Sequence, residues 1–325
     1  MIWRCGRFSF DTQMPIVMGI LNVTPDSFSD GGQHFAADAA LEAARAMHEA
    51  GALIIDVGGE STRPGATPVS IEEELVRTID VVRTLASEGI CVSIDTRHAE
   101  VAQEAIEAGA SIINDVSGMR DPLMVRVAGH CDAGIIVMHM QGEPATMQDD
   151  PQYTDVVAEV RDYLMHQVDM LERAGIASDR IAIDPGPGFG KTPKQTIELM
   201  RNIHEFVRTG YPVVAAVSRK GYIGYAYGIE NPADRDEASA EEALMACELG
   251  ASVVRTHNVP VTVAKLADVR PFVLLGLGCN IALVGEPGQE REAKIAQLNL
   301  AISSLSLMPE TQIIDIRSFY ASEPA

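Results

Sequence analysis

The 325-residue chain is predicted to be an α/β protein, a (β/α)8 or TIM barrel with a short C-terminal α+β extension. Two observations predict the barrel. Short runs rich in Val and Ile alternate with longer amphipathic segments, a pattern typical of parallel strands that helices cover on the outside. Each run also ends in a polar or charged residue, and a closed barrel gathers its eight strand ends at one rim, where barrel enzymes have their active sites.

The expected strands are short and evenly spaced. They span residues 16–22, 53–59, 91–96, 111–116, 134–139, 180–186, 212–219 and 252–257. Helical patterns lie between most of them, for example at 38–52, 71–89 and 99–110, and several end in Gly just before the next run, as helices often do. The loops 22–35 and 58–70 are long and rich in Gly, Pro, Ser and Thr. Such loops are usually binding loops or lids, so we prefer that function over surface decoration.

Polar residues at the strand ends form the candidate site. They are Asn22, Asp56, Asp95, Asn114 with Asp115, His139, Asp184, Ser218 to Lys220, and Arg255 with His257. Solvent at the ends of strands explains a few of them, but not acids, amides and cations at nearly all eight. We therefore predict a site at the rim.

Composition excludes several functions. Lys and Arg number 25 against 46 Asp and Glu, so the formal net charge is −21. Nucleic acid and anionic membranes need a basic face, so neither is expected as a partner, and a bound anion must rely on a few local cations. The longest apolar stretch, 271–285, is shorter than the roughly 20 residues of a membrane span. Five cysteines without a CxxC pair and a start without a signal peptide predict a cytoplasmic protein without disulfides or zinc.

Eight motifs carry a resemblance to a known family. They are MGILNVTPDSFSDGG (18–32), IIDVGGESTRPGA (54–66), SIDT (93–96), IINDV (112–116), MHMQGEPATMQ (138–148), DPGPGFGK (184–191), SRK (218–220) and RTHNV (255–259). In this order and spacing, over roughly residues 14–270, they resemble the dihydropteroate synthases. Members of that family are (β/α)8 barrels and sulfonamide targets. They condense 6-hydroxymethyl-7,8-dihydropterin diphosphate with p-aminobenzoate to give 7,8-dihydropteroate and pyrophosphate in folate biosynthesis.

The resemblance implies a pterin pocket. Asp95, Asn114 and Asp184 match the family's pterin-binding residues, and buried carboxylates and amides suit the donors and acceptors of a 2-amino-4-oxo ring. Met138 and Phe189 match apolar walls for that ring, a role that we prefer over ordinary core packing.

The resemblance also implies an anion pocket. Strands seven and eight end in Arg219, Lys220, Arg255 and His257, close to where barrels bind phosphate. In the family, the positions of Asn22, Arg255 and His257 bind the diphosphate, and Asn22 also holds Mg²⁺. Lys220 matches the residue that binds the pterin carbonyl and borders the aminobenzoate.

The expected catalytic residues are Asp95, Lys220, Arg255 and His257. Asp95 would stabilise a pterin cation after the diphosphate departs, while Mg²⁺, Arg255 and His257 would stabilise the departing charge. In the family, the loop positions Thr62, Arg63 and Pro64 close over the aminobenzoate together with Ser218. The amine of p-aminobenzoate is nucleophilic, so no strong base is required.

Two positions and one segment depart from the family pattern. Pro187 stands where a bulky apolar residue is more frequent, and Asn258 stands where Asp is common. The segment 234–251 contains the added acids Glu237, Glu241 and Glu242, close to the expected anion pocket. We expect these acids to weaken binding of the diphosphate.

The predicted domains are a synthase-like barrel at 1–270 and an extension at 271–325. The segments 271–283 and 313–325 resemble the opening of a hydroxymethyl-dihydropterin pyrophosphokinase, an incomplete ferredoxin-like unit without its acidic magnesium pair. The alternative is an extension used in dimerisation, and a homodimer is expected in either case.

Two other functions stay open at this point. A methyltetrahydrofolate:corrinoid methyltransferase shares the pterin pocket but needs neither the TRPGA loop nor SRK. A non-catalytic pterin-binding paralogue would keep the pocket without turnover, and the unusual segment 234–251 favours it.

Overall fold

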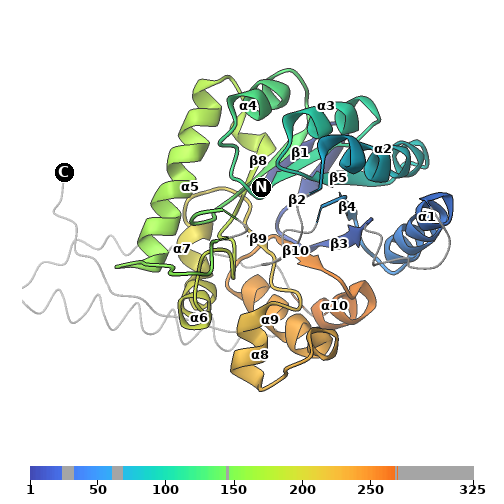
Figure 1. Cartoon of the computed structure of the whole chain (residues 1–325). Coiled ribbons are helices and arrows are strands. Elements are labelled where there is room, and N and C mark those ends of the chain that lie inside the picture. Colours follow the sequence, from blue (N-terminus) through green and yellow to red (C-terminus); the bar gives the residue numbers. More distant parts are fainter. Residues whose placement is uncertain (24–32, 61–68, 144–145, 268, 270–325) are drawn as a thin grey trace, which may run out of the picture. The chain divides into compact units, whose positions relative to one another are not determined.

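Parallel strands form the centre of the molecule, and helices surround them (Figure 1). The computed structural model describes residues 1–23, 33–60, 69–143, 146–267 and 269. Its strands are β3 (Ile16–Asn22), β4 (Ile54–Gly58), β5 (Cys91–Asp95), β6 (Ile112–Asp115), β7 (Gly134–Met138), β8 (Ile181–Asp184), β9 (Val214–Ala215) and β10 (Val253–Thr256).

The sheet has the closed order of a barrel. Hydrogen bonds join the strands in the order β8-β7-β6-β5-β4-β3-β10-β9. A parallel bridge between Ile183 and Val213 joins the two outer strands, and the Ile183 N–H donates to the Pro212 carbonyl oxygen over 2.9 Å. The predicted (β/α)8 barrel is confirmed.

Ten helices lie in the described ranges, and several of them begin at a short polar side chain that caps them. They are α1 (Gln33–Glu49), α2 (Ile71–Ser87), α3 (Ala99–Glu107), α4 (Pro122–Gly129), α5 (Val156–Arg173), α6 (Pro193–Arg201), α7 (Ile203–Val207), α8 (Gly221–Tyr227), α9 (Asp236–Glu248) and α10 (Val259–Leu266), with 3-10 turns η2 (Ser178–Arg180) and η3 (Pro232–Arg235). The Ser70 hydroxyl accepts the Glu73 N–H at the start of α2, and Thr192 and Gln195 form a reciprocal capping box at α6. No helix in the described ranges has the length and apolar character needed to cross a bilayer.

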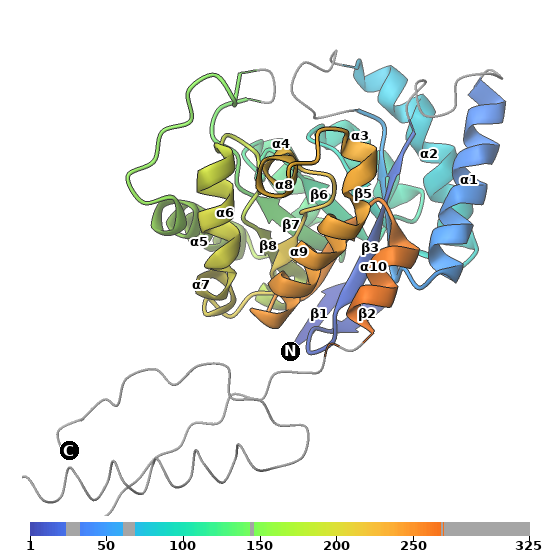
Figure 2. The same cartoon turned by 90° about the horizontal axis from the view of Figure 1, so that it is seen from below.

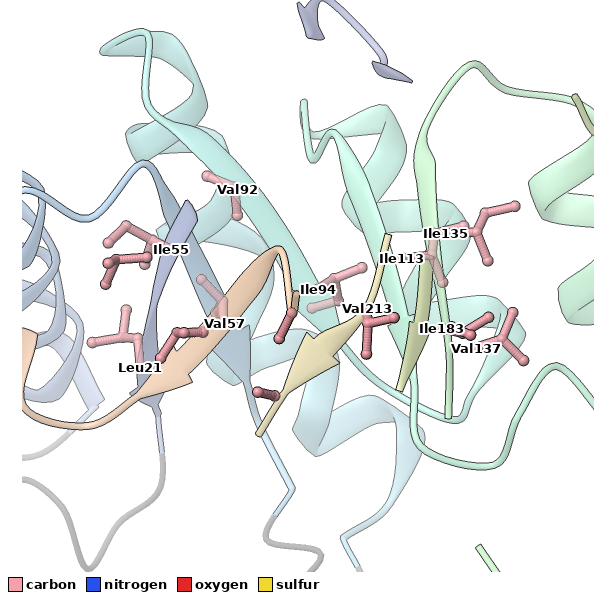
Figure 3. Packing of buried hydrophobic residues seen from close by; sticks show 14 of the residues in the cluster. Leu21, Ile55, Val57, Val92, Ile94, Ile113, Ile135, Val137, Ile183 and Val213 are labelled. Atoms are coloured by element: carbon pink, nitrogen blue, oxygen red, sulfur yellow. The ribbon is translucent and has the colours of Figure 1, made fainter. Parts of the chain in front are cut away.

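Alternation along each strand separates two parts of the core. Outward-facing residues pack between the strands and the helices. Figure 3 shows Leu21, Ile55, Val57, Val92, Ile94, Ile113, Ile135, Val137, Ile183 and Val213 in this layer. The residues between them face the barrel interior. Those at the start of the strands are apolar, and most of those at the end are polar, so the interior has an apolar end and a polar end.

A hairpin that the sequence analysis did not predict covers the apolar end of the interior. Strands β1 (Ile2–Cys5) and β2 (Phe8–Asp11) are antiparallel, and a two-residue turn with Gly6 at φ +57° joins them (Figure 2). Trp3 is fully buried there, and its indole N–H donates to the Arg180 carbonyl oxygen over 3.0 Å. Trp3 packs with the first residues of five barrel strands, Ile16, Ile54, Cys91, Ile112 and Val253. The signal in the sequence was the Gly-X turn between two alternating segments.

The strand predicted at 212–219 is much shorter in the structure. β9 has two residues, because the chain turns after Ala216: the Lys220 N–H donates to the Val217 carbonyl oxygen over 3.2 Å, and Arg219 has φ +58°. The predicted lids fall mainly on residues 24–32 and 61–68, outside the described residues, as does the whole predicted extension.

Candidate active site

One arginine joins two carboxylates at the polar end of the barrel. The Arg255 Nε lies 2.6 Å from Asp56 Oδ2, and its Nη2 lies 2.6 Å from Asp95 Oδ2. The Asn114 Nδ2 donates to the same Asp56 oxygen over 3.0 Å. These residues come from β10, β4, β5 and β6, so four strand ends are tied together across the barrel.

The charges of this group are strongly coupled. Burial raises the pKa of Asp95 to about 7, although the Arg255 guanidinium opposes that shift. Burial alone would lower the pKa of Arg255, but Asp56 and Asp95 outweigh it and hold that pKa above its ordinary value. Asp56 Oδ1 and Ser93 Oγ are buried without a hydrogen-bond partner among the described residues. Two carboxylates and one cation leave this group with acceptor capacity, which suits a ligand with N–H donors.

Asp184 lies at the end of β8 and orders the loop after it. Its Oδ1 accepts the Gly186 N–H over 2.7 Å, and burial raises its pKa above the ordinary value. Gly186 has φ +65°, and a Cβ there would lie 2.0 Å from the His139 carbonyl oxygen. Only glycine fits this position, which holds the loop directly against the end of β7.

An apolar wall stands beside these polar residues. Five buried side chains form it: Val116, Met138, Met140, Met147 and Phe189. The Lys220 Nζ lies 4.1 Å from the centroid of the Phe189 ring, so the ring both adds apolar surface and stabilises the ammonium group. Met138 and Phe189, predicted as walls, therefore belong to one cluster.

The turn after β9 directs neighbouring side chains to different partners. The Ser218 Oγ accepts the His257 N–H over 3.1 Å and lies 2.9 Å from His257 Nδ1. Arg219 instead forms a two-pronged ion pair with Asp236, at 2.6 and 2.9 Å. We expected Arg219 among the cations near the anion pocket, but its guanidinium is engaged by a carboxylate at the start of α9.

Two of the acids that were expected to weaken diphosphate binding have partners of their own. Glu241 pairs with Lys265, and Glu242 accepts the hydroxyls of Tyr222 and Tyr227 over 3.1 and 3.0 Å. These contacts hold α9 against α8 and α10. Asp236, which the sequence analysis did not single out, is the acid of this segment that reaches the strand ends, where it also accepts the Asn258 Nδ2 over 2.8 Å.

Asn22 ends β3 and is half-buried beside Gly58 and, on the next strand, Asp95. Over the residues described, no three His, Cys, Asp or Glu side chains gather in a way that could hold a metal ion. Mg²⁺ needs few protein ligands when phosphate oxygens and water complete its shell, so a single amide oxygen at this position fits it.

The loop after β4 is anchored by an ion pair. Glu60 accepts two N–H groups of Arg97, over 3.0 and 3.1 Å, and the Val69 N–H over 3.2 Å. The two residues that flank 61–68 are thereby joined. The predicted loop residues Thr62, Arg63 and Pro64 lie in that segment, outside the described residues.

Most predicted residues thus meet at one end of the barrel. Three important ones were missed or given no role. Asp56 and His139 had been recognised only as polar strand ends, and Lys191 is a buried lysine within a glycine-rich loop. Asp115, in contrast, faces outward and accepts the Ser117 and Met119 N–H groups of its own turn over 2.7 and 2.9 Å.

Comparison with known proteins connects this site to one family. Residues 18–257 match the family model described as pterin binding enzyme. The dihydropteroate synthase of Escherichia coli strain K12 is 45% identical over 262 residues, which is 80% of this chain and 93% of that protein.

Two solved structures extend the comparison. Burkholderia cenocepacia dihydropteroate synthase in complex with 7,8-dihydropteroate matches with a TM-score of 0.75 and 42% identity, over 82% of this chain and 94% of that one. The Yersinia pestis enzyme with a sulfonamide drug complex matches with a TM-score of 0.78 and 39% identity, over 82% and 97%.

Proposed function

This chain belongs to the pterin-binding enzyme family, and from that membership we propose how its residues carry out the dihydropteroate synthase reaction. The reaction joins 6-hydroxymethyl-7,8-dihydropterin diphosphate to p-aminobenzoate and releases pyrophosphate. It makes the chain a transferase of a pterinylmethyl group in folate biosynthesis. The relationship at 45% identity favours this activity over that of a corrinoid methyltransferase.

In this proposal Asp95, Asn114 and Asp184 bind the pterin. The observation that carries it is that three polar side chains from three strands meet at one end of the barrel. There Asp95 accepts from Arg255 and Asp184 accepts from the Gly186 N–H, which leaves each carboxylate with further acceptor capacity. The ring supplies the missing N–H donors to the two carboxylates, and Asn114, fixed by Asp56, pairs with the rest. Met138 and Phe189 cover the ring, and Lys220 above Phe189 is close enough to serve the pterin carbonyl.

The chemistry is substitution at the CH₂ carbon. The C–O bond to the diphosphate breaks first, and both electrons leave with the oxygen. The pterin keeps the positive charge, which Asp95 stabilises, while Arg255 and His257 stabilise the leaving group. The amine nitrogen then forms the C–N bond and loses a proton. Arg255 has two functions here, because its guanidinium also balances Asp56 and Asp95.

Asn22 would hold Mg²⁺ in this scheme, and the ion when bound supplies positive charge against the diphosphate. Ser218 fixes the His257 ring: its Oγ accepts the backbone N–H and can donate its own proton to Nδ1, which places the ring proton on Nε2. Thr62, Arg63 and Pro64 complete the aminobenzoate site in this proposal.

We also propose a barrel domain at 1–270, a pyrophosphokinase-like start at 271–325, a homodimer and a cytoplasmic location. A truncation after Arg270 that keeps full synthase activity would support this domain boundary.

The direct test is pyrophosphate release from the purified chain with both substrates and Mg²⁺. We expect release that needs p-aminobenzoate and that sulfonamides inhibit. An Asp95→Asn variant is the control for contaminating enzyme. Tight binding of a pterin without any release would instead identify a non-catalytic paralogue.

A further inference from the structure

Lys191 is a lysine enclosed in the protein, and among the described residues no carboxylate forms an ion pair with its ammonium group. It is 2% exposed. Its Nζ lies 2.9 Å from the Gly186 carbonyl oxygen, 3.0 Å from that of Phe189, 3.4 Å from that of His139, and 2.9 Å from His139 Nδ1. Four acceptors thus surround one group that can only donate.

The contact with His139 fixes the state of that ring. When Lys191 is protonated, its ammonium group has no lone pair, so Nδ1 accepts and the ring proton sits on Nε2. Burial, reinforced by the charge of Lys191, lowers the pKa of His139 to about 2, which keeps the ring neutral. Edge-to-face packing on Tyr163, with ring centroids 4.9 Å apart, holds the ring in place.

This arrangement costs stability. Burial lowers the pKa of Lys191 to about 7 from an ordinary value of 10.5, against the attraction of Asp184 and together with the repulsion of Lys220. The unfolded chain therefore binds this proton more tightly than the folded one between pH 7 and 10.5, so the contribution to stability is lowest below pH 7 and recovers as the pH rises. Stability therefore does not explain why a lysine is buried at this position.

The acceptors show what Lys191 holds. Gly186 and Phe189 belong to the loop after β8, and His139 directly follows β7. Through the Gly186 N–H the loop fixes Asp184, and through Phe189 it supports Lys220. A Cβ on Gly188 would lie 3.7 Å from Lys220 Cδ, so the stem of Lys220 rests on the same loop. One ammonium group thereby determines the positions of three groups of the pterin site.

We propose that Lys191 is a positioning residue for pterin binding: its ammonium group, seated on His139 and on the Gly186 and Phe189 carbonyls, holds the loop after β8 so that Asp184, Phe189 and Lys220 present one surface to the ring. Lys191 itself is enclosed and touches no substrate. The inference rests on the proposed function, because it concerns the pocket assigned there to the pterin.

The test uses two binding measurements on the full chain. Calorimetry with 6-hydroxymethylpterin reports the ring pocket, and calorimetry with pyrophosphate and Mg²⁺ reports the anion pocket. In Lys191→Met we expect pterin affinity to fall by about tenfold to a hundredfold, as displacement of binding groups by about 1 Å does. Pyrophosphate affinity should change less than about twofold, and the KM for the pterin diphosphate should rise while that for p-aminobenzoate does not.

Matched variants separate positioning from general damage. Lys194→Met removes an exposed lysine of α6 and should leave both affinities unchanged. His139→Leu removes the Nδ1 acceptor and should also weaken pterin binding. His139→Asn, whose side-chain oxygen can replace Nδ1, should restore most of it. If Lys191→Met does not fold, the comparison of His139→Leu with His139→Asn tests the positioning role instead.

The outcomes are distinct. Unchanged pterin affinity in folded Lys191→Met, or equal affinities in the two histidine variants, overturns the positioning role. An equal loss of pterin and pyrophosphate affinity also overturns it, because the effect is then general. A wild-type chain that binds no pterin contradicts the proposed function instead.

Discussion

The two ends of the barrel interior are built from the same strands but do different work. At one end the first residues of the strands pack apolar side chains around Trp3. At the other end, two or four residues further along, the inward positions carry Asp56, Asp95, Asn114 and Arg255. The apolar end gains stability from burial, whereas the polar end buries charges and costs stability. Packing at the apolar end stabilises the strands, and the stable strands hold the charged side chains of the polar end in fixed positions.

The largest expected effect is at Arg255, where one substitution should lower both stability and activity. Arg255→Ala leaves Asp56 and Asp95 without their shared cation, and loss of one partner of a buried ion pair costs about 3–5 kcal/mol. We expect both the free energy of unfolding and turnover to fall sharply, measured by urea titration and pyrophosphate release.

Adding Asp56→Asn to Arg255→Ala sharpens that prediction. The double variant should recover part of the stability, since one unpaired charge is gone, but no activity. Recovery of turnover would mean that Arg255 acts on Asp56 alone and not on the substrates.

At the apolar end, Trp3→Ala should reduce stability without changing the site. Removal of a buried Trp side chain costs about 3–5 kcal/mol. Below its lowered melting temperature the variant should bind 6-hydroxymethylpterin with wild-type affinity by calorimetry. A large loss of affinity would show that the two ends are coupled.

At the polar end, Asp184→Asn should weaken pterin binding and leave stability nearly unchanged. An amide presents donors where the ring also has donors, and a buried mismatch of this kind costs about 1–3 kcal/mol of binding. We expect weaker pterin binding by calorimetry with a melting temperature close to that of the wild type. Normal binding would remove Asp184 from the pterin pocket.

The smallest effect concerns pH. The pKa of Asp95 is about 7 when folded against an ordinary 3.8, so the folded chain binds this proton more tightly and stability falls as the pH rises from about 4 to 7. Pterin binding needs the ionised carboxylate and should strengthen over the same range. Melting temperature and pterin affinity, measured at pH 5 and 7.5, should thus move in opposite directions. Asp95→Asn should weaken both trends, and Asp184, whose pKa burial also raises, should keep part of them.

How far the sequence predicts this structure differs between the two ends. The barrel strands are predictable because runs such as 91–96 and 111–116 are short, apolar and end in polar residues, and the structure has strands there. Rim position follows from the same pattern. The pattern does not predict which charged residues pair with each other. Asp56 and Arg255 are 199 residues apart, and only closure of the barrel brings them together.

Other features depend on the tertiary structure. The hairpin is a short alternating segment whose strands form because the open end of the barrel accepts Trp3. Lys191 has the chemistry of a surface residue, and only the turns at Gly186 and Gly190 enclose it. Arg219 has a left-handed backbone conformation that composition does not predict.

The hairpin also gives the molecule a built-in optical reporter. Trp3 is the sole tryptophan among the 325 residues, it is fully buried, and its indole N–H is bound to a carbonyl oxygen. When only tryptophan is excited, the fluorescence therefore comes from one known place, the apolar end of the barrel opposite the candidate site. Undocking of β1 and β2 exposes that indole to water and shifts its emission to longer wavelength. The wild-type chain thus distinguishes opening at the base of the barrel from events at the rim without any added label.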